Sequence, residues 1–349
     1  MDAGTRFDLV ARGAEEIVTE EELASLLDQK DKIRSYVGFE PSGLMHIGQG
    51  FVIARKVIDF SEAGFETMIL LADWHAYIND KLGGNLENIK TCGDYVRDCF
   101  VALGVDPGRT EFLFAHELVG RREYWQKVLS ISKNATVSRM RRAMTIMGRK
   151  EEDADVDASK LIYPAMQAAD IVELDLDVAL GGMDQRHAHM LLRDVAGKID
   201  ARKPVAVHTP LLSGLQGGGR MDSFEAKMSK SRPETFISIH ERPDVVEQKV
   251  RKAFCPEGDV HDNPVLEICR LIVLPEIEEF KVEREAKFGG DVAFSSYDEL
   301  SGAFGARELH PSDLKSATTR YLNEILAPVR DYFERNPENY GKMIELTSQ

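Results

Sequence analysis

Cysteine is scarce in this chain of 349 residues: the four present stand alone at positions 92, 99, 255 and 269, without a Cys-x-x-Cys pair. This shortage argues against a disulfide framework and a zinc site, and we expect no metal held by the protein. Long apolar runs are also missing, because the strongest, Met68–Ala72, ends at Asp73, far short of the roughly 20 residues that cross a bilayer. The start, Met1-Asp2-Ala3, turns acidic by Glu15 and does not look like a secretory signal. These absences predict a cytoplasmic protein without a membrane segment.

Basic residues are in deficit, since 44 Lys and Arg face 59 Asp and Glu and leave a formal net charge of −15. The molecule as a whole is therefore not expected to bind nucleic acid through bulk charge. Residues 121–150 depart from this balance, with nine basic side chains and one acidic one, Glu123. Such a run is either the solvated face of a helix or a local basic surface for a phosphate backbone, and both interpretations stay open.

The apolar residues, within a chain that is 43% hydrophobic, alternate between short continuous runs and helical spacing. Two helices are expected within the first 30 residues, the second capped by Thr19. The expected strands lie at 35–39, 67–72, 111–114, 178–180 and 205–208, and helices at 47–60 and 86–103. This alternation predicts an α/β fold with a Rossmann-like, doubly wound parallel sheet.

The last third of the chain changes character and is expected to be helical. The helical stretches are 244–254, 264–273 and 314–333, and Pro328 is expected to kink the last one. The predicted domains are residues 1–220 with the sheet, 221–243 as a loop linker, and 244–349 as a C-terminal α-helical domain.

The first chemical motif is Pro41-Ser42-Gly43-Leu44-Met45-His46-Ile47-Gly48-Gln49, at an expected strand-to-helix turn. Free backbone N–H groups and the helix dipole make such a turn a natural phosphate site. Gly43 lets the chain turn, and Gly48 lets a nucleotide lie against bare backbone. His46 can donate a hydrogen bond to a phosphoryl oxygen.

The second motif is Lys227-Met228-Ser229-Lys230-Ser231, within a Gly-rich polar loop. Its two lysines can close over a triphosphate, although an exposed basic loop is an equally good interpretation of this run alone. In this order along the chain, the two motifs resemble the HIGH and KMSKS elements of class I aminoacyl-tRNA synthetases.

Six segments narrow this resemblance to the tyrosyl-tRNA synthetases of the archaeal and eukaryotic type. They are Tyr36–Gly43, Leu71–Tyr77, Tyr163–Asp170, Gly181–Arg186, Phe288–Gly290 and Glu308–Lys315. The resemblance implies that ATP and L-tyrosine form tyrosyl-adenylate and pyrophosphate, and that the tyrosine then passes to the terminal ribose of tRNA(Tyr). It also implies Mg²⁺ bound with ATP, an anticodon-binding role for the helical domain, and a homodimer.

The tyrosine site that the resemblance implies is largely polar. Its residues are Tyr36, Glu40, His75, Tyr163, Gln167, Asp170 and Gln185. Tyr36 and Asp170 are placed on the phenol hydroxyl, and Tyr163, Gln167 and Gln185 on the α-amino end. An ionised Asp170 accepts the phenol O–H strongly, whereas phenylalanine would leave Tyr36 and Asp170 unpaired in a dry pocket.

The resemblance also implies an ATP site and a set of catalytic residues. The ATP-binding residues are Pro41, Ser42, Gly43, His46, Gly48, Lys227, Met228, Ser229, Lys230 and Ser231. The catalytic residues are His46, Gly48, Gln49, Lys227 and Lys230. The two lysines are assigned to the departing pyrophosphate and His46 to the phosphoryl oxygens, so that catalysis is mainly positioning and charge stabilisation.

Five residues are implied to bind tRNA. Arg142 and Arg186 would reach the first base pair of the acceptor stem, where arginine can fork onto guanine or phosphate. Phe288, His310 and Asp313 match residues that receive the first anticodon base, which is read by stacking and by hydrogen bonds to its edge.

The segment at about 120–160 is expected to serve the acceptor stem and the dimer. Its apolar side chains Trp125, Val128, Leu129 and Ile131 belong either to the dimer interface or to the core.

Three positions depart from the family pattern. Gln49 stands where a second histidine is usual, Val119 where close relatives carry a pocket glutamine, and His187 where a lysine is common. A relative with altered amino-acid specificity, a tryptophan-specific relative and a non-catalytic RNA-binding relative therefore stay as alternatives. A generic nucleotidyl transferase is a more remote one, because it would not explain the anticodon-type residues.

Overall fold

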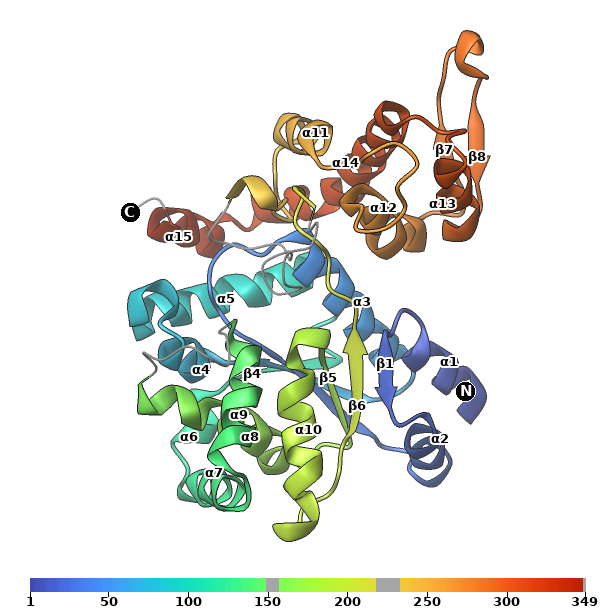
Figure 1. Cartoon of the computed structure of the whole chain (residues 1–349). Helices are drawn as coiled ribbons and strands as arrows, with labels where there is room; N and C mark the ends of the chain where they lie inside the picture. The colour runs from blue at the N-terminus through green and yellow to red at the C-terminus, as the bar shows by residue number, and fades with distance from the viewer. Residues whose placement is uncertain (149–156, 218–232, 348–349) are drawn as a thin grey trace. The chain divides into compact units, whose positions relative to one another are not determined.

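The structure, a computed structural model, describes residues 1–148, 157–217 and 233–347 (Figure 1). The predicted ATP-site residues that lie outside the described residues are Lys227, Met228, Ser229, Lys230 and Ser231. The chain divides into two compact units. The first comprises Met1–Gly43, Ile53–Pro210 and Glu338–Gln349, and the second comprises Leu44–Val52 and Leu211–Pro337. None of the helices in the described ranges is long and apolar enough to cross a membrane.

A six-stranded sheet forms the middle of the first unit, in the order β1-β6-β5-β2-β3-β4. Its strands are β1 (Glu16–Val18), β2 (Arg34–Phe39), β3 (Glu66–Leu71), β4 (Thr110–Phe114), β5 (Val178–Gly182) and β6 (Val205–Thr209). The strands β2 to β6 run parallel, whereas β1 at the edge runs antiparallel to β6. The predicted parallel sheet is confirmed, since the five expected strands are β2 to β6.

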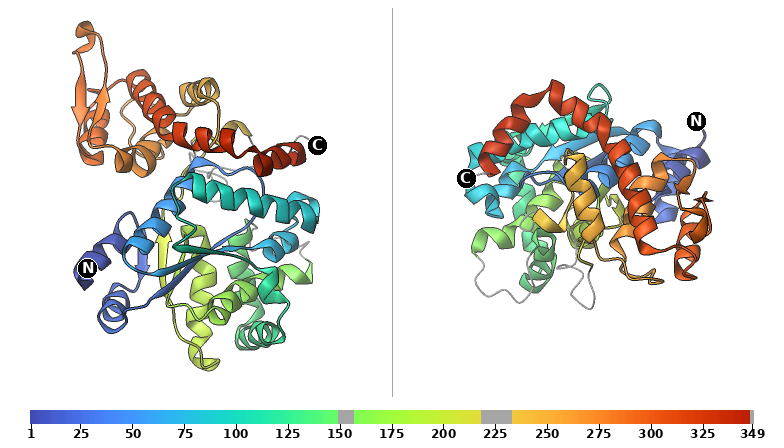
Figure 2. Two further views of the ribbon diagram at one scale, coloured as in Figure 1. Left: turned by 180° about the vertical axis from the view of Figure 1, so that it is seen from behind. Right: turned by 90° about the horizontal axis from the view of Figure 1, so that it is seen from above.

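Helices cover both faces of this sheet, as the front and back views show (Figures 1 and 2). The helices of this unit are α1 (Ala3–Ala11), α2 (Glu20–Gln29), α3 (Ile47–Glu62), α4 (Asp73–Ile78), α5 (Leu86–Ala102), α6 (His116–Val119), α7 (Arg122–Asn134), α8 (Val137–Ala143), α9 (Ala158–Glu173), α10 (Arg186–Val195) and α15 (Pro337–Thr347), the last of which packs beside α5. Short turns of 3₁₀ helix are η1 (Lys81–Gly84), η2 (Met144–Met147), η3 (Met183–Gln185) and η4 (Ala196–Lys198). Tyr36 of β2 packs with Met68 among side chains of α7, α9 and α10, whereas Phe39 of the same strand meets Phe100 of α5 edge-on at 5.3 Å.

The order of the strands reverses between β2 and β5. From β2 the chain adds β3 and then β4 on one side, and later places β5 and then β6 on the other. In open α/β sheets, ligands bind at the carboxyl ends of the strands at such a switch point. Glu40 follows the carboxyl end of β2, and Gln185 follows that of β5, so the sequence order brings two predicted site residues to this point.

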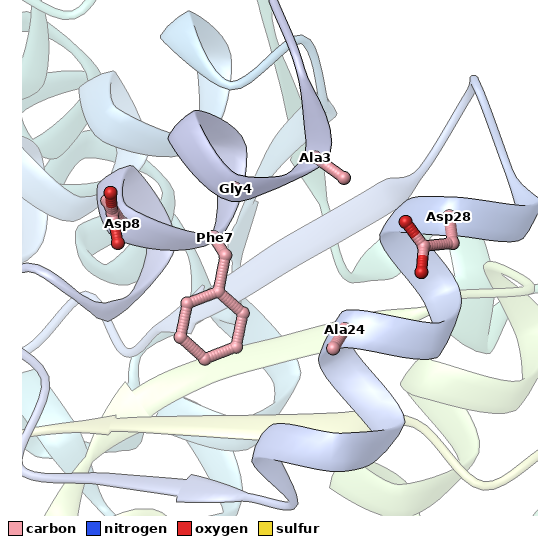
Figure 3. Close-up of a pocket in the computed structure, with 6 residues that line it drawn as sticks. All are labelled: Ala3, Gly4, Phe7, Asp8, Ala24 and Asp28. Carbon is pink, nitrogen blue, oxygen red and sulfur yellow. The ribbon is translucent and has the colours of Figure 1, made fainter.

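The N-terminal segment differs from its prediction in one element. Both expected helices are present, and the side chain of Thr19 caps α2 by accepting from Glu22 N at 3.1 Å. Between them the three residues of β1 form an edge strand, which is too short to show alternation in the sequence. A pocket of about 260 Å³ lies between α1 and α2, with Phe7 between the carboxylates of Asp8 and Asp28 in the view of Figure 3. It contains none of the predicted site residues.

The second unit is helical with one added hairpin. Its elements are η5 (Pro233–Thr235), α11 (Pro243–Lys252), α12 (Pro264–Ile268), the π-helical turn η6 (Cys269–Val273), η7 (Leu274–Glu276), β7 (Phe280–Val282), η8 (Ala286–Phe288), β8 (Val292–Phe294), α13 (Tyr297–Gly305) and α14 (Pro311–Arg335). The expected helices are present, and α14 continues through Pro328. The antiparallel pair of β7 and β8 was not predicted, because strands of three residues leave little pattern.

Candidate active site

A row of polar side chains on α9 faces the core of the first unit. Tyr163, Gln167 and Asp170 follow one another at intervals of four and three residues, which places them on one side of a helix. All three are buried, and so are Tyr36 of β2 and His75 of α4. The structure therefore turns five of the seven predicted tyrosine-binding residues away from solvent.

Asp170 is the centre of this group. Its Oδ1 accepts a hydrogen bond from Tyr124 Oη at 2.8 Å, and its Oδ2 lies 3.0 Å from His75 Nε2. Burial works against a charge on His75, but Asp170, with smaller contributions from Glu40 and Asp73, outweighs it, so the pKa of the imidazole is raised. Burial, and then the charge of Asp170, raises the pKa of Tyr36 well above its ordinary value. Among the described residues, Tyr36 Oη has no partner of good hydrogen-bond geometry, and neither have the ring nitrogens of His75. The amide of Gln167 works against the other two causes and lowers the pKa of Tyr36.

A second cluster surrounds Glu40, just after β2. Its Oε1 accepts from Tyr163 Oη at 3.2 Å and from Asn79 Nδ2 at 2.9 Å. Asn79 also donates to the carbonyl of Met147 at 3.1 Å, so it ties the carboxylate to η2. The ring of Tyr163 meets that of His75 edge-on at 5.1 Å, which joins this cluster to the group around Asp170.

Gln167 and Gln185 form the third contact of the predicted set. Gln167 Nε2 donates to Gln185 Oε1 at 3.2 Å, and Gln185 Nε2 donates to the carbonyl of Ile146 at 3.3 Å. Gly181 at the end of β5 makes room for this arrangement, because a Cβ there would lie 2.9 Å from Gln185 Cβ. Contacts within the first unit thus connect Glu40, Tyr163 and His75 with Asp170, and Gln167 with Gln185, all of them predicted tyrosine-binding residues.

Three buried residues of this region were missed from the sequence: Tyr124, Asn79 and Asp73. Asp73 accepts from the backbone N–H of His116 at 3.0 Å, and its Oδ2 lies 2.6 Å from His116 Nδ1, so it holds α4 against α6. Tyr124 stands within the basic run, where charge dominates the pattern. For Asn79 and Tyr124 no local signal separates a pocket residue from a core residue. Val119, the noted departure, is a partly buried apolar contact of the core.

The Pro41–Gln49 motif is divided between the two units. Gly43, in the first unit, has φ of 129°, a value that other residues rarely adopt, and this explains its glycine. In the second unit, His46 Nδ1 accepts from Gln49 N at 3.2 Å, which leaves the proton of a neutral ring on Nε2. A Cβ at Gly48 would lie 2.8 Å from Leu212 Cβ, so packing as well as nucleotide access explains this glycine.

Arg142 and Arg186, the predicted acceptor-stem residues, stand near one another. Thr145 Oγ1 donates to the carbonyl of Arg142 at 3.0 Å and lies 2.9 Å from Nδ1 of His187, the neighbour of Arg186. Burial lowers the pKa of His187, and so do Arg139, Arg186 and Arg142. Three arginines therefore lie close enough to His187, one of the three noted departures, to act on its charge. Arg186 itself forms an ion pair with Glu16.

The predicted anticodon residues lie on the surface of the second unit. Phe288 ends η8 in the connection between β7 and β8, is 60% exposed, and has Lys287 Nζ 4.8 Å from its ring centre. His310 caps α14 by accepting from Ser312 N at 3.2 Å, and Asp313 stands in the first turn of that helix. Within residues 1–148, 157–217 and 233–347 there is no group of three or more His, Cys, Asp or Glu side chains placed to hold a metal ion.

Comparison with known proteins identifies the family. The family model described as tRNA synthetases class I (W and Y) matches residues 28–327. A tyrosine–tRNA ligase of Sulfurisphaera tokodaii is 50% identical over 341 residues, which are 95% of this chain and 93% of that protein. The crystal structure of tyrosyl-tRNA synthetase from Aeropyrum pernix is 44% identical, with a TM-score of 0.90 and 100% of both chains covered. The one from Pyrococcus horikoshii, complexed with L-tyrosine, is 42% identical, with a TM-score of 0.92 and coverage of 99% of this chain and 100% of that one. This chain belongs to the class I tRNA synthetases of the W and Y group.

Proposed function

We propose that this chain attaches L-tyrosine to tRNA(Tyr) with ATP, in the cytoplasm. The observation that carries the proposal is the buried hydroxyl of Tyr36, which has no partner of good hydrogen-bond geometry among the described residues, in the group around the carboxylate of Asp170. A buried polar atom without a partner is costly, and the phenol of a bound tyrosine supplies one. The relatives from Sulfurisphaera tokodaii and Aeropyrum pernix, which are 50% and 44% identical in sequence to this chain, are named for the same reaction.

The pocket suits a phenol better than an indole or a phenyl ring. Asp170 accepts a hydrogen bond from the substrate O–H. Tyr124 and His75 each contact one of the two carboxylate oxygens of Asp170 and so fix its orientation. Phenylalanine has no hydroxyl to offer, and the indole of tryptophan does not need a phenol acceptor. At the other end of the substrate, Tyr163, Gln167, Gln185 and Glu40 face the α-ammonium group, with Glu40 supplying the opposite charge.

The reaction proceeds in two steps. In the first, a carboxylate oxygen of tyrosine bonds to the α-phosphorus of ATP, the bond to the bridging oxygen breaks, and pyrophosphate leaves. In the second, a hydroxyl of the terminal ribose of tRNA bonds to the activated carbonyl carbon and AMP leaves. The protein forms no covalent bond in either step and acts by positioning and by stabilising phosphate charge.

The phosphates of ATP are assigned to the two motifs. Pro41, Ser42, Gly43 and Gly48 offer backbone to the nucleotide, His46 donates from Nε2 to a phosphoryl oxygen, and Gln49 donates where a second histidine is usual. Lys227 and Lys230, with Met228, Ser229 and Ser231, are assigned to the pyrophosphate. Mg²⁺ enters with ATP, since this hard cation keeps several waters and binds substrate phosphates.

The tRNA is assigned to two places, one in each unit. Arg142 and Arg186 approach the acceptor stem, and Phe288, His310 and Asp313 receive the anticodon. In domain terms, residues 1–220 carry activation, 221–243 the motif loop, and 244–349 anticodon recognition.

We also propose a homodimer through the outer face of α7. Of the four apolar side chains expected there, Val128 and Ile131 are buried in the core, whereas Trp125 and Leu129 are 39% and 68% exposed. Two large exposed apolar side chains one turn apart favour a partner surface. Sedimentation of the wild type and of Leu129→Glu tests this: a wild type that is already monomeric at micromolar concentration would contradict it.

Amino-acid-dependent exchange of pyrophosphate into ATP tests the function most directly. The assay is run with tyrosine, phenylalanine and tryptophan separately, and we expect exchange with tyrosine alone. Exchange driven by tryptophan would make this chain the indole-specific relative, and exchange with none of the three would favour a non-catalytic RNA-binding protein.

A further inference from the structure

Four side chains form a hydrogen-bonded line within the first unit. Arg186, the first residue of α10, donates from Nε to Glu16 of β1, at 2.7 Å to Oε2 and 3.0 Å to Oε1. Glu16 Oε2 lies 2.9 Å from Nδ1 of His208 in β6, and His208 Nε2 lies 3.0 Å from Nδ1 of His189 in α10. The two histidines are buried, whereas Arg186 and Glu16 reach solvent. The line therefore runs from the core of the first unit to its surface.

Chemistry fixes the direction of each hydrogen bond in this line. A carboxylate only accepts, so His208 carries its proton on Nδ1. Burial lowers the pKa of His208, so its ring is neutral and Nε2 holds a lone pair, to which His189 donates from Nδ1. Burial, and then the neighbouring His208, lowers the pKa of His189 to about 3. The hydrogen bond from His208 Nδ1 thus holds the carboxylate of Glu16 in one orientation.

The backbone fixes the same two residues. Glu16 is the register partner of His208 in the antiparallel pair of β1 and β6, and Glu15 N donates to the carbonyl of His208 at 2.8 Å. The short strand β1 therefore delivers a single carboxylate to the beginning of α10.

Arg186 is held by one edge of its guanidinium. Glu16 takes the Nε–H, and among the described residues neither Nη atom of Arg186 has a hydrogen-bond partner. Because the guanidinium is planar and rigid, fixing the Nε edge sets the direction of the remaining N–H groups. The side chain is 38% exposed, so these donors are available to a phosphate or a guanine edge.

We propose that Glu16, backed by His208, is a positioning residue that aims Arg186 at the acceptor end of tRNA. The inference rests on the proposed function, and it gives β1 a part in recognition that acts through Arg186. The competing interpretation is that the line only fastens β1 to the sheet. In that case its loss would lower stability without acting through Arg186.

Glu16→Gln separates the two interpretations, because glutamine keeps the size and an acceptor for His208 but loses the charge that holds Arg186. We expect the Kd for a tRNA(Tyr) transcript, measured without ATP at fixed salt, to rise about tenfold, the usual scale of a charge-assisted hydrogen bond. Tyrosine-dependent ATP–pyrophosphate exchange and the thermal midpoint are expected to stay unchanged. Glu15→Gln makes the same change of charge at the exposed neighbouring residue and is expected to leave the Kd as it is.

Arg186→Ala supplies a readout that a purely structural role would not move. Added to Arg186→Ala, Glu16→Gln is expected to weaken tRNA binding no further, since Glu16 acts only through Arg186. Equal weakening in both backgrounds, or an unchanged Kd in Glu16→Gln alone, would overturn the proposal. Because binding is measured without catalysis, a wild type that fails to exchange pyrophosphate with tyrosine would count against the proposed function and not against this inference.

Discussion

Two regions assigned to recognition are built in opposite ways. In the first unit, the groups around Asp170 are buried: Tyr36 and His75 are each 2% exposed, and Tyr163 is 6% exposed. In the second unit, Phe288 is 60% exposed in the connection of a short hairpin. The first region pairs polar atoms within itself, Tyr124 with Asp170 and Tyr163 with Glu40, whereas the second presents one aromatic face with a lysine beside it.

The contrast shows how differently the two regions can bind. In a buried pocket, water cannot replace a lost partner, so each hydrogen bond discriminates strongly between ligands. On an exposed ring, stacking adds free energy for any base, and water takes over when the base leaves. We therefore expect substitutions in the pocket to have large effects on one small substrate, and substitutions at the hairpin to have moderate effects on RNA alone.

Asp170→Ala is expected to have the largest effect. It removes the acceptor of the substrate phenol and leaves Tyr124 and His75 facing no carboxylate. We expect kcat/KM for tyrosine in pyrophosphate exchange to fall roughly a thousandfold, the scale of breaking a buried charge pair, while KM for ATP changes little. Unchanged exchange with tyrosine would remove Asp170 from the phenol site.

Tyr124→Phe is the graded version of that change. It deletes one hydroxyl, the donor to Asp170 Oδ1, and keeps the ring in the core. We expect KM for tyrosine to rise about tenfold and kcat to fall less, because one hydrogen bond to a charged group is lost. A fall in kcat alone would contradict a role in holding the carboxylate for substrate binding.

Phe288→Ala probes the other region. Loss of one stacked base contact is expected to raise KM for tRNA(Tyr) about tenfold and to leave pyrophosphate exchange untouched, because exchange needs no tRNA. Phe288→Tyr keeps a ring and is the matched control. If both variants charge tRNA as well as the wild type, Phe288 is only a surface residue of the hairpin.

The sequence predicted most of the fold because the four inner strands of the sheet, β6, β5, β2 and β3, are largely buried on both faces. Residues 67–72 form a continuous apolar run that reads as a strand without any partner in view, and β3 ends within one residue of it. The strands β1, β7 and β8 are only three residues long and leave little pattern, and β1 pairs with a strand distant in the chain, as Glu16 does with His208. No local pattern can indicate such pairing.

The site could be predicted only where its residues belong to a motif. The Tyr163–Asp170 segment carries three pocket residues at helical spacing, so the sequence and the resemblance agree there. Asn79 and Tyr124 became visible only through the fold, because their roles consist of contacts to Glu40 and Asp170. The link from Glu16 to Arg186 spans 170 positions along the chain and has no signature at either end.

The smallest expected effect is on stability in acid, where a buried titratable group differs from an exposed one. The ordinary pKa of histidine is 6.5, and burial lowers that of His189 to about 3. Between these values the unfolded chain takes up a proton that the folded chain does not bind, so the free energy of unfolding falls as the pH falls from 6.5 towards 3. The slope from this group is at most about 1.4 kcal/mol per pH unit.

His189→Gln is therefore expected to flatten the decrease in unfolding free energy between pH 7 and pH 5, measured by urea denaturation at each pH. His261→Gln, at an exposed position of the second unit, is the matched control and is expected to keep the wild-type decrease. Comparing slopes rather than absolute stabilities removes the cost of placing an amide in the core. If His189→Gln keeps the full wild-type slope, His189 takes up its proton equally in the folded and unfolded chain. That result would contradict the neutral state of His189 on which the hydrogen-bond directions from His189 to Glu16 depend.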